Sequence, residues 1–505
     1  MKKQVSKNIA INFFSFLCNV LVGILLTPYL VSKLGVVAYG LIPMAMIFTD
    51  YINVITQSIT SSINRLLTVA IEKKQYTDAK IIFSTALSLM TMFAIFQFIL
   101  VYYPILNLDK VISIPDNILK DAKNLFILVF ANFSLSLVTS VLSVSMYATN
   151  RLDIMQSLQI VRAISRVLFI VILFLYWEVS LTAIGIASVI SGIVVIIMTL
   201  IISRRLTPEL KYNLSCFDLG KFKEISAFGG WILVNQLGFL LLSKVDLIIL
   251  NRYVGLYEAG VYSAIMQIIN VVKSFALVFA GVTGPMVMIY FANQDNDKII
   301  SVTKTFIGFL TLSIAVSIAV VVMNSYSLME YWLGETYSEH GQLLSYMLMS
   351  ILLSLGMLPI FSVNVAIGKV KIPALFSLFC GLLGLTISYY TANYTQLGVY
   401  SVVLGTFISL TLKNAIFSPL YVSQCLGISY NTFFNAQLKG LIMFAVSLLF
   451  CKLFNKYVVV NNMSELFLVM LTQFSILIVL SVFFYDKKDK SMLTDLLKNK
   501  VRKNE

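Results

Sequence analysis

The sequence predicts an all-α integral membrane protein with about fourteen transmembrane helices. Of the 505 residues, 59% are hydrophobic and 12% are charged, whereas soluble domains carry roughly a quarter charged residues. Apolar stretches of about 20 residues recur along the chain, which is the length that a helix needs to cross the roughly 30 Å hydrocarbon core. Backbone N–H and C=O groups find no water there, so the spans must be helices.

The candidate spans follow one another with short polar segments between them. They cover residues 9–31, 38–60, 81–104, 124–147, 159–177, 181–203, 226–250, 258–282, 301–323, 342–365, 374–393, 397–419, 434–456 and 464–485. An even number of spans puts both termini on one side of the membrane.

The distribution of Lys and Arg predicts which side that is. With the N-terminus in the cytoplasm, 28 of the 37 basic residues fall in inner segments, Lys413 among them, and seven fall in outer segments. Cytoplasmic loops carry such an excess, so we expect both termini to be cytoplasmic. The same distribution explains the net charge of +14 without nucleic acid, because the basic residues lie in short loops and form no basic domain.

The chain repeats itself at an offset near 220 residues. Three matched pairs carry the repeat: Gly35-x-x-x-x-Gly40 with Gly255-x-x-x-x-Gly260, segment 148–154 with segment 366–372, and Lys80-Ile-Ile with Lys298-Ile-Ile. Six spans separate equivalent points, so both halves cross the membrane in the same direction. We therefore expect two parallel six-helix pseudo-repeats around a central cavity, plus two C-terminal helices.

This organisation gives four segments. They are an N-terminal six-helix lobe (1–210), a C-terminal six-helix lobe (211–425), two additional transmembrane helices (426–485) and a basic cytoplasmic tail (486–505).

Polar residues at helical spacing form stripes on the first, second, fourth, seventh and eighth spans. The candidate cavity residues on and beside these stripes are Asn12, Asp50, Asn53, Gln57, Asn132, Gln236, Lys244, Asp246, Gln267, Asn270 and Lys273. The alternative is that the Ser, Asn and Gln side chains only join helices by interhelical hydrogen bonds. The repeat favours the cavity, because it distributes the stripes over both halves.

Charged residues inside spans are stronger evidence, since an ionisable side chain in hydrocarbon is costly. Asp50, Lys244, Asp246 and Lys273 are such residues, and the alternative for them is a structural ion pair such as Asp50 with Lys273. Near the inner face, three arginines are candidates to receive an anionic head group, although positive-inside retention explains them equally well. They are Arg65, Arg162 and Arg166.

Catalysis and metal binding have little support in the sequence. His340 is the single histidine, and the five cysteines are scattered without a C-x-x-C pair, so a metal site is not expected and a His-based triad is improbable. We expect no cofactor and no catalytic residue.

Several short motifs together resemble a known transporter family. They are Asn8-Ile-Ala-Ile-Asn12-Phe-Phe, Leu26-Thr-Pro28-Tyr-Leu-Val-Ser-Lys-Leu-Gly35-x-x-x-Tyr-Gly40, Asp246-Leu-Ile-Ile-Leu-Asn251-x-x-x-Gly255-x-x-x-Ala-Gly260-x-Tyr262, and Gly368-Lys369. With the span count and the repeat, the chain resembles the lipid-linked oligosaccharide flippases of the multidrug, oligosaccharidyl-lipid and polysaccharide exporter superfamily, which translocate O-antigen or capsule repeat units.

The resemblance implies alternating access in a bacterial cytoplasmic (inner) membrane. The implied substrate is an undecaprenyl-diphosphate-linked oligosaccharide moved to the outer leaflet, with H⁺ or Na⁺ as candidate coupling ions, membrane lipids around it, and polymerase or chain-length proteins as candidate partners. Lys244 and Lys273 would attract the diphosphate. The rival functions are a drug or organic-cation antiporter of the same superfamily, which Asp50 and Asp246 favour, and a membrane glycan polymerase or ligase.

Overall fold

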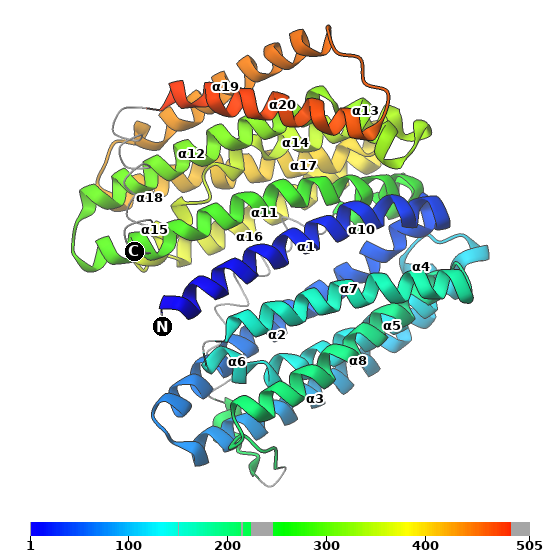
Figure 1. Cartoon of the computed structure of the whole chain (residues 1–505), viewed down its shortest axis with the longest axis vertical. Helices are drawn as coiled ribbons and strands as arrows, with labels where there is room; N and C mark the ends of the chain where they lie inside the picture. Colours follow the sequence, from blue (N-terminus) through cyan, green and yellow to red (C-terminus); the bar gives the residue numbers. More distant parts are fainter. Residues whose placement is uncertain (1, 150, 214–215, 224–245, 486–505) are drawn as a thin grey trace. The chain divides into compact units, whose positions relative to one another are not determined.

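A computed structural model describes residues 2–149, 151–213, 216–223 and 246–485, and in these residues all regular secondary structure is helical (Figure 1). The helices of the first half are α1 (Lys2–Leu34), α2 (Val36–Glu72), α3 (Tyr76–Leu106), α4 (Leu108–Val111), α5 (Asp116–Leu142), α6 (Val144–Ala148), α7 (Leu152–Tyr176) and α8 (Leu181–Leu206).

The second half continues in the same manner. Its helices are α10 (Asp246–Ile249), η2 (Leu250–Val254), α11 (Leu256–Ala292), α12 (Asn296–Met323), α13 (Ser325–Leu333), η3 (Glu335–His340), α14 (Gly341–Leu355), α15 (Ile360–Ala366), α16 (Lys371–Tyr394), α17 (Tyr400–Leu410), η4 (Thr411–Phe417), α18 (Ser418–Leu426), α19 (Asn431–Asn455), α20 (Met463–Ser481) and η5 (Val482–Phe484).

Among the described residues, 12 helical segments are long and apolar enough to cross a membrane. The all-α membrane class predicted from composition is therefore confirmed. Twelve of the fourteen predicted spans each overlap one of these segments. The second predicted span lies on α2, of which Val36–Ile47 forms a shorter apolar stretch, and the seventh lies largely outside the described residues. The total of fourteen stays a prediction.

The chain forms two compact units. The N-terminal unit comprises residues 1–240 and 247–264, and the C-terminal unit comprises residues 241–246 and 265–505. The first turns of α11 thus belong to the N-terminal unit, although the repeat in the sequence assigns them to the second half.

The glycine motifs of the repeat form hairpins with a defined geometry. Gly35 and Gly255 have φ of 79° and 141°, in the region that only glycine adopts without strain. The second glycines, Gly40 on α2 and Gly260 on α11, pack against each other within the N-terminal unit. A Cβ on Gly40 would lie 2.8 Å from the Gly260 Cα, and a Cβ on Gly260 would overlap the carbonyl oxygen of Val36.

Other turns also repeat between the two halves. Lys74 and Gln294 are the two described non-glycine residues with positive φ, at 56° and 57°, and they are 220 positions apart. The N–H of Arg151 donates to the Met146 carbonyl at 2.7 Å. At an offset of 218, the N–H of Lys369 donates to the Asn364 carbonyl at 3.0 Å. The sequence repeat is therefore matched by equivalent local backbone structure.

In the N-terminal unit, one carboxylate of α5 binds the first residues of α8. Asp121 on α5 accepts hydrogen bonds from the backbone N–H groups of Leu181 and Thr182, at 2.6 and 2.7 Å, and also from the Thr182 hydroxyl. A carboxylate at a helix N-terminus satisfies N–H groups that have no partner inside the helix and is favoured by the helix dipole. This contact fixes α8 against α5.

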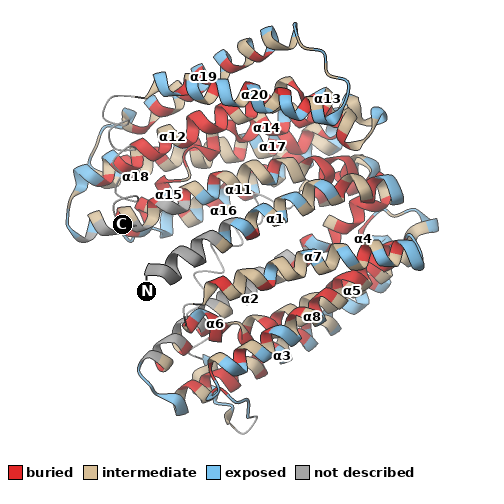
Figure 2. Cartoon of the chain, in the orientation of Figure 1, coloured by how far each residue is buried: buried red, intermediate tan, exposed pale blue. Residues whose placement is uncertain are grey.

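The core of the C-terminal unit runs along α12 and α14, whose residues are largely buried (Figure 2). Three amide side chains attach α19 and α20 to this core. Asn324 donates to the Gln473 oxygen at 2.9 Å, Gln473 donates to the Asn455 oxygen at 2.6 Å, and Asn455 donates to the Asn324 oxygen at 3.1 Å. Each amide thus donates to the next in a closed ring, which satisfies polar groups that would be costly inside a membrane protein.

The contact between the two repeat glycines gives a stability test. We expect Gly260→Val to destabilise the protein by about 1–3 kcal/mol, because the new side chain forces α2 and α11 apart. Gly308→Val on α12 is the matched control, since a Cβ there meets no atom within 4 Å. Thermal unfolding of the purified variants in detergent measures the difference. Equal midpoints for both variants would contradict the close packing.

Candidate functional site

The candidate site in the N-terminal unit is built around two arginines on α7. Arg162 and Arg166 are one turn apart, so their side chains leave the same face of the helix. Because α7 begins at Leu152, Arg166 lies roughly 21 Å along the helix from its first residue. Both arginines therefore lie inside the span, deeper than the inner-face position expected from the sequence.

Arg162 is connected to the polar stripe of α5. Its Nη1 donates to the Ser136 hydroxyl at 3.1 Å, and that hydroxyl donates to the Asn132 carbonyl at 3.0 Å. The Asn132 side chain packs directly on Gly192 of α8, where a Cβ would overlap the amide oxygen. The structure thus brings Asn132 and Arg162, predicted separately, into one polar cluster.

Arg166 lies on the side of the cluster next to α2. Its electrostatic neighbour is Tyr39, whose hydroxyl is 3.2 Å from the Thr27 hydroxyl of α1. Stacking of Tyr29 on Phe174, with ring centroids 6.0 Å apart, helps to pack α1 against α7. Tyr39 and Thr27 belong to a hairpin motif of the family resemblance, but they were not predicted as site residues because neither lies on a predicted polar stripe.

The cluster contains buried polar atoms that make no hydrogen bond within the described chain. They are the Nε atoms of Arg162 and Arg166 and the Oδ1 atom of Asn132. No salt bridge joins either guanidinium to a carboxylate whose side chain the structure describes, a set that does not include Asp50 of α2. Buried arginine donors usually have a partner, since leaving them without one costs free energy. Planar guanidinium donors of this kind are the groups that bind carboxylate and phosphate anions in proteins.

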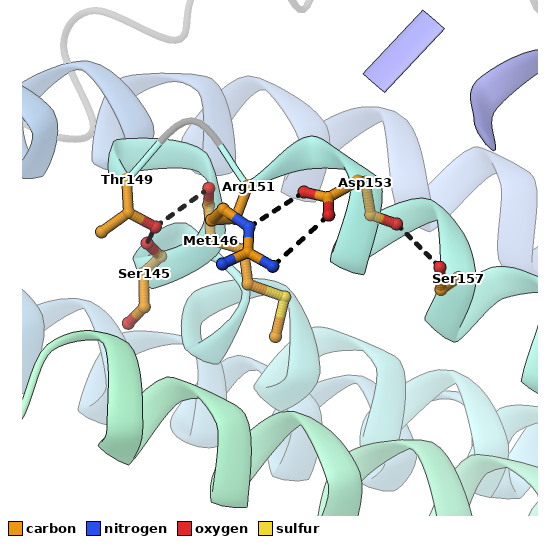
Figure 3. A network of polar contacts seen from close by, with 6 residues as sticks. All are labelled: Ser145, Met146, Thr149, Arg151, Asp153 and Ser157. Atoms are coloured by element: carbon orange, nitrogen blue, oxygen red, sulfur yellow. Dashed lines mark hydrogen bonds and ion pairs between the residues drawn. The ribbon is translucent and has the colours of Figure 1, made fainter. Parts of the chain in front are cut away.

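A third arginine of the same unit, unlike Arg162 and Arg166, forms an ion pair within the chain (Figure 3). Arg151, between α6 and α7, donates from Nε to Asp153 at 3.1 Å. Asp153 is buried, and its backbone carbonyl accepts from the Ser157 hydroxyl at 2.9 Å. This arginine is neutralised by the chain itself, so it serves as an internal comparison for Arg162 and Arg166.

The other predicted residues of this unit are less informative. Asn12 lies on α1 with an exposed side chain. Four further residues lie on α2, but their side chains are outside the described set: Asp50, Asn53, Gln57 and Arg65. Their predicted roles therefore stay predictions.

In the C-terminal unit, the structure connects Asp246 to α17. The Thr406 hydroxyl donates to the Asp246 carboxylate at 3.0 Å. Gln267 and Lys273 lie half-buried on α11, and Asn270 on the same helix is exposed. Gln236 and Lys244 fall outside the described residues.

Lys413 is an intramembrane charge that the sequence analysis assigned to an inner segment. It lies at the centre of the segment Tyr400–Leu426, roughly 20 Å from either end, which is too deep for its ammonium to reach the membrane surface. The π-helix η4 surrounds it, and the Cys380 thiol is its electrostatic neighbour. Its position six residues inside the predicted end of span 12 was the signal that could have identified it.

The polar hydrogen bonds around η4 explain how this irregular helix is tolerated. The Ser418 hydroxyl donates to the Lys413 carbonyl at 2.9 Å, and Gln437 of α19 donates to the Ala415 carbonyl at 3.2 Å. Side chains thus satisfy carbonyls where the helical pattern changes, and π-helical segments are frequent at functional sites.

Comparison with solved structures identifies the fold as that of a transporter class. The chain superposes on the lipid II flippase MurJ in an inward closed conformation with a TM-score of 0.70 and 15% identity, covering 94% of this chain and 98% of that one. It superposes on an inward-facing multidrug resistance MATE family transporter with a TM-score of 0.66 and 13% identity, covering 83% and 98%.

Sequence comparison then gives the family. The family model described as "Polysaccharide biosynthesis protein" matches residues 5–291, and the chain belongs to this family. The membrane protein EpsK of Bacillus subtilis (strain 168) is 26% identical over 435 residues, covering 86% of this chain and 85% of that protein. A Shigella flexneri protein named as an O-antigen transporter is 22% identical over 433 residues, covering 84% and 99%. The membrane transporter class expected from the sequence is thus confirmed.

The arginine cluster predicts anion binding that can be measured without the natural substrate. We expect the purified protein to bind inorganic diphosphate, and Arg166→Gln to weaken that binding about tenfold or more, because a hydrogen bond to a charged group contributes roughly 1.5–3 kcal/mol. Isothermal titration calorimetry measures the affinity. Arg151→Gln is the matched control, since Asp153 already neutralises that arginine. The same loss in both variants would remove Arg166 from the site.

Proposed function

We propose that this protein is a flippase that translocates undecaprenyl-diphosphate-linked oligosaccharide repeat units from the cytoplasmic to the outer leaflet for surface polysaccharide biosynthesis, by alternating access. Membership of the polysaccharide biosynthesis family and the transporter fold support the substrate class and the type of activity. The protein from Shigella flexneri is named for transport of an O-antigen, which is a lipid-linked glycan of this kind.

The observation that carries the proposal is the arginine pair of α7. A diphosphate needs donors in the middle of the membrane, where charge is otherwise unfavourable. Arg162 and Arg166 offer guanidinium groups at that depth whose Nε atoms have no partner in the described chain. The sugar hydroxyls need hydrogen-bonding side chains, and the amide and hydroxyl groups beside the arginines supply them. An organic-cation antiporter would place carboxylates at such a site instead.

Lys273, Lys244 and Lys413 would add positive charge that attracts the diphosphate head group. A lysine ammonium attracts phosphate as a point charge and does not require the planar geometry of a guanidinium. Both termini are proposed to be cytoplasmic, which places the basic tail after residue 485 on the side from which the substrate is loaded.

The proposed function predicts the location of the substrate in a deletion strain. Without the protein, lipid-linked repeat units should accumulate on the cytoplasmic leaflet, because a diphosphate and a glycan do not cross hydrocarbon unaided. A lectin against the repeat unit should then bind inverted membrane vesicles and not intact spheroplasts. The wild-type gene should restore the binding to spheroplasts.

Two other outcomes would contradict this function. Drug sensitivity of the deletion strain, with no accumulated lipid-linked units, would indicate the antiporter. Normal display of single repeat units without polymer would indicate the glycan polymerase.

The charge of Lys273 can be tested separately. We expect Lys273→Ala to lower translocation more than Lys273→Arg, because arginine retains the positive charge that attracts the diphosphate. The measurement is the rate at which lectin-accessible units appear on spheroplasts, at matched protein levels. Equal rates for the wild type and both variants would remove Lys273 from the site.

A further inference from the structure

The two halves of the chain differ in how one pair of equivalent helices packs together. At an offset of 218, α5 and α8 of the first half correspond to α14 and α17 of the second half. The short sequences Ser136-Leu and Ser354-Leu match at this offset, as do Ile190-Ser and Ile408-Ser. The pattern of buried and exposed residues along these helices also matches. Residues 218 positions apart therefore occupy equivalent places in the two helix pairs.

In the first half the two helices are in direct contact. Gly185 of α8 lies against Leu128 of α5, where a Cβ on the glycine would come within 2.7 Å of the leucine Cδ1. Only a residue without a side chain allows this approach. The space between α5 and α8 at this level is filled by the Leu128 side chain.

In the second half the same positions hold larger residues, and the helices leave a groove. Tyr346 replaces Leu128 and Val403 replaces Gly185. Between α14 and α17 lies a cavity of about 450 Å³, lined by residues that include Met349, Leu404 and Phe407. A valine in place of glycine keeps the two backbones apart, because its branched Cβ needs the volume that Leu128 occupies in the first half.

The walls of this groove (the α14–α17 groove) are apolar. Ser350 is a polar residue of the lining, and its hydroxyl is already bonded to the Met347 carbonyl at 2.7 Å. Tyr346 and Tyr400 meet edge to face at one end, with ring centroids 5.6 Å apart. Tyrosine is enriched where a membrane protein meets the lipid head groups. The groove therefore has an amphipathic end and a hydrocarbon-like interior.

The depth of the groove fits one leaflet. The lining residues of α14 and α17 lie within about ten residues of the first residue of each helix, which corresponds to roughly 15 Å of helix. This is half of the hydrocarbon thickness of about 30 Å. The loops before both helices are outer loops in the topology predicted from the basic residues, which places the groove in the outer leaflet.

The rim of the groove is continuous with surface that a membrane helix presents to lipid. Tyr346, Leu404 and Phe407 have 43%, 37% and 39% of their surface exposed. Large apolar side chains at the surface of a membrane span are favoured where they meet hydrocarbon, and we assign this rim to the lipid-facing surface on that ground. A chain entering the groove therefore comes from the bilayer and needs no passage through water.

We propose that the α14–α17 groove binds one acyl chain of an outer-leaflet phospholipid. At roughly 30 Å³ for a group of the size of water, the cavity has room for about fifteen methylene groups, which is close to the length of one acyl chain. The lipid fills the gap that Val403 opens and takes the packing role that Leu128 has in the first half. This proposal goes beyond translocation of a glycan and does not depend on it.

Photo-crosslinking of lipid tests the proposal directly. The purified protein is reconstituted into vesicles of phosphatidylethanolamine and phosphatidylglycerol in which part of the phosphatidylethanolamine carries a diazirine in its acyl chain. After irradiation, adducts are mapped by peptide mass spectrometry. We expect adducts to concentrate on the groove residues of α14 and α17, above the level on the equivalent residues of α5 and α8. Equal labelling of the two helix pairs would overturn the proposal.

Two variants of α17 make the test specific. Val403→Phe fills the groove, so labelling there should fall to the level of α5 and α8. Ile408→Phe is the matched control on the same helix outside the lining, and it should leave the labelling unchanged. Gel filtration checks that each variant is monodisperse. If Val403→Phe does not fold, the proposal is judged by the wild-type protein alone, from the ratio of adducts on α14 and α17 to adducts on α5 and α8. Groove labelling that persists in a folded Val403→Phe variant would overturn the proposal.

A competition experiment identifies the class of lipid. Excess phosphatidylethanolamine without the diazirine should reduce the groove adducts in proportion to its fraction of the membrane. Suppression by undecaprenyl phosphate at a fraction where added phosphatidylethanolamine has no effect would assign the groove to a polyprenyl chain, and would overturn the phospholipid assignment.

Discussion

The structure depends on the fact that hydrocarbon offers no hydrogen bonds. The backbone satisfies this constraint by forming helices, and many small polar side chains satisfy it by donating to the carbonyl one turn earlier. Thr199 donates to Val195 at 2.7 Å and Ser263 to Ala259 at 2.7 Å. Larger polar side chains satisfy it through each other, as in the amide ring that attaches α19 and α20. Some buried hydroxyls, such as those of Thr303 and Ser447, also lack a partner among the described residues. A charged donor without a partner costs more free energy than a neutral hydroxyl and therefore requires a specific explanation.

Similar backbone geometry in the two halves supports different side-chain packing. The hairpin glycines are retained in both halves, because one needs a positive φ and the other allows α2 and α11 to touch. At the Gly185 position the halves diverge, because the backbone there is ordinary helix and glycine is needed only for contact with Leu128. A glycine that the backbone requires is thus present in both halves. A glycine that only packs against a side chain, such as Gly185 against Leu128, can be replaced when another group fills the space, and we propose that in the second half this group is lipid.

Hydropathy identified the fold class and most spans, since the cost of exposing backbone in hydrocarbon is averaged over about 20 residues. It was less reliable for span boundaries and for some charges within spans, since Arg162 and Arg166 were assigned to the inner face. Asp153, Gln156 and Ser157 lower the hydropathy of the first turns of α7, so the predicted span began at residue 159 although α7 begins at Leu152. Contacts were less predictable still: Asp246 and Thr406 are 160 residues apart, and no local pattern indicates that they meet. The glycine repeat predicted two hairpins, but only the structure showed that Gly40 packs on Gly260.

A ligand shifts a conformational equilibrium only as far as it interacts differently with the two states. Charges already neutralised within the chain, such as Arg151 with Asp153, gain little from an incoming anion. Arg162 and Arg166 lie on the same helix as Asp153, yet no carboxylate with a described side chain pairs with them. A guanidinium that serves only to hold helices together is stabilised by a nearby carboxylate, as Arg151 is by Asp153. The retention of two such donors is consistent with a cycle in which an anionic substrate provides the missing charge.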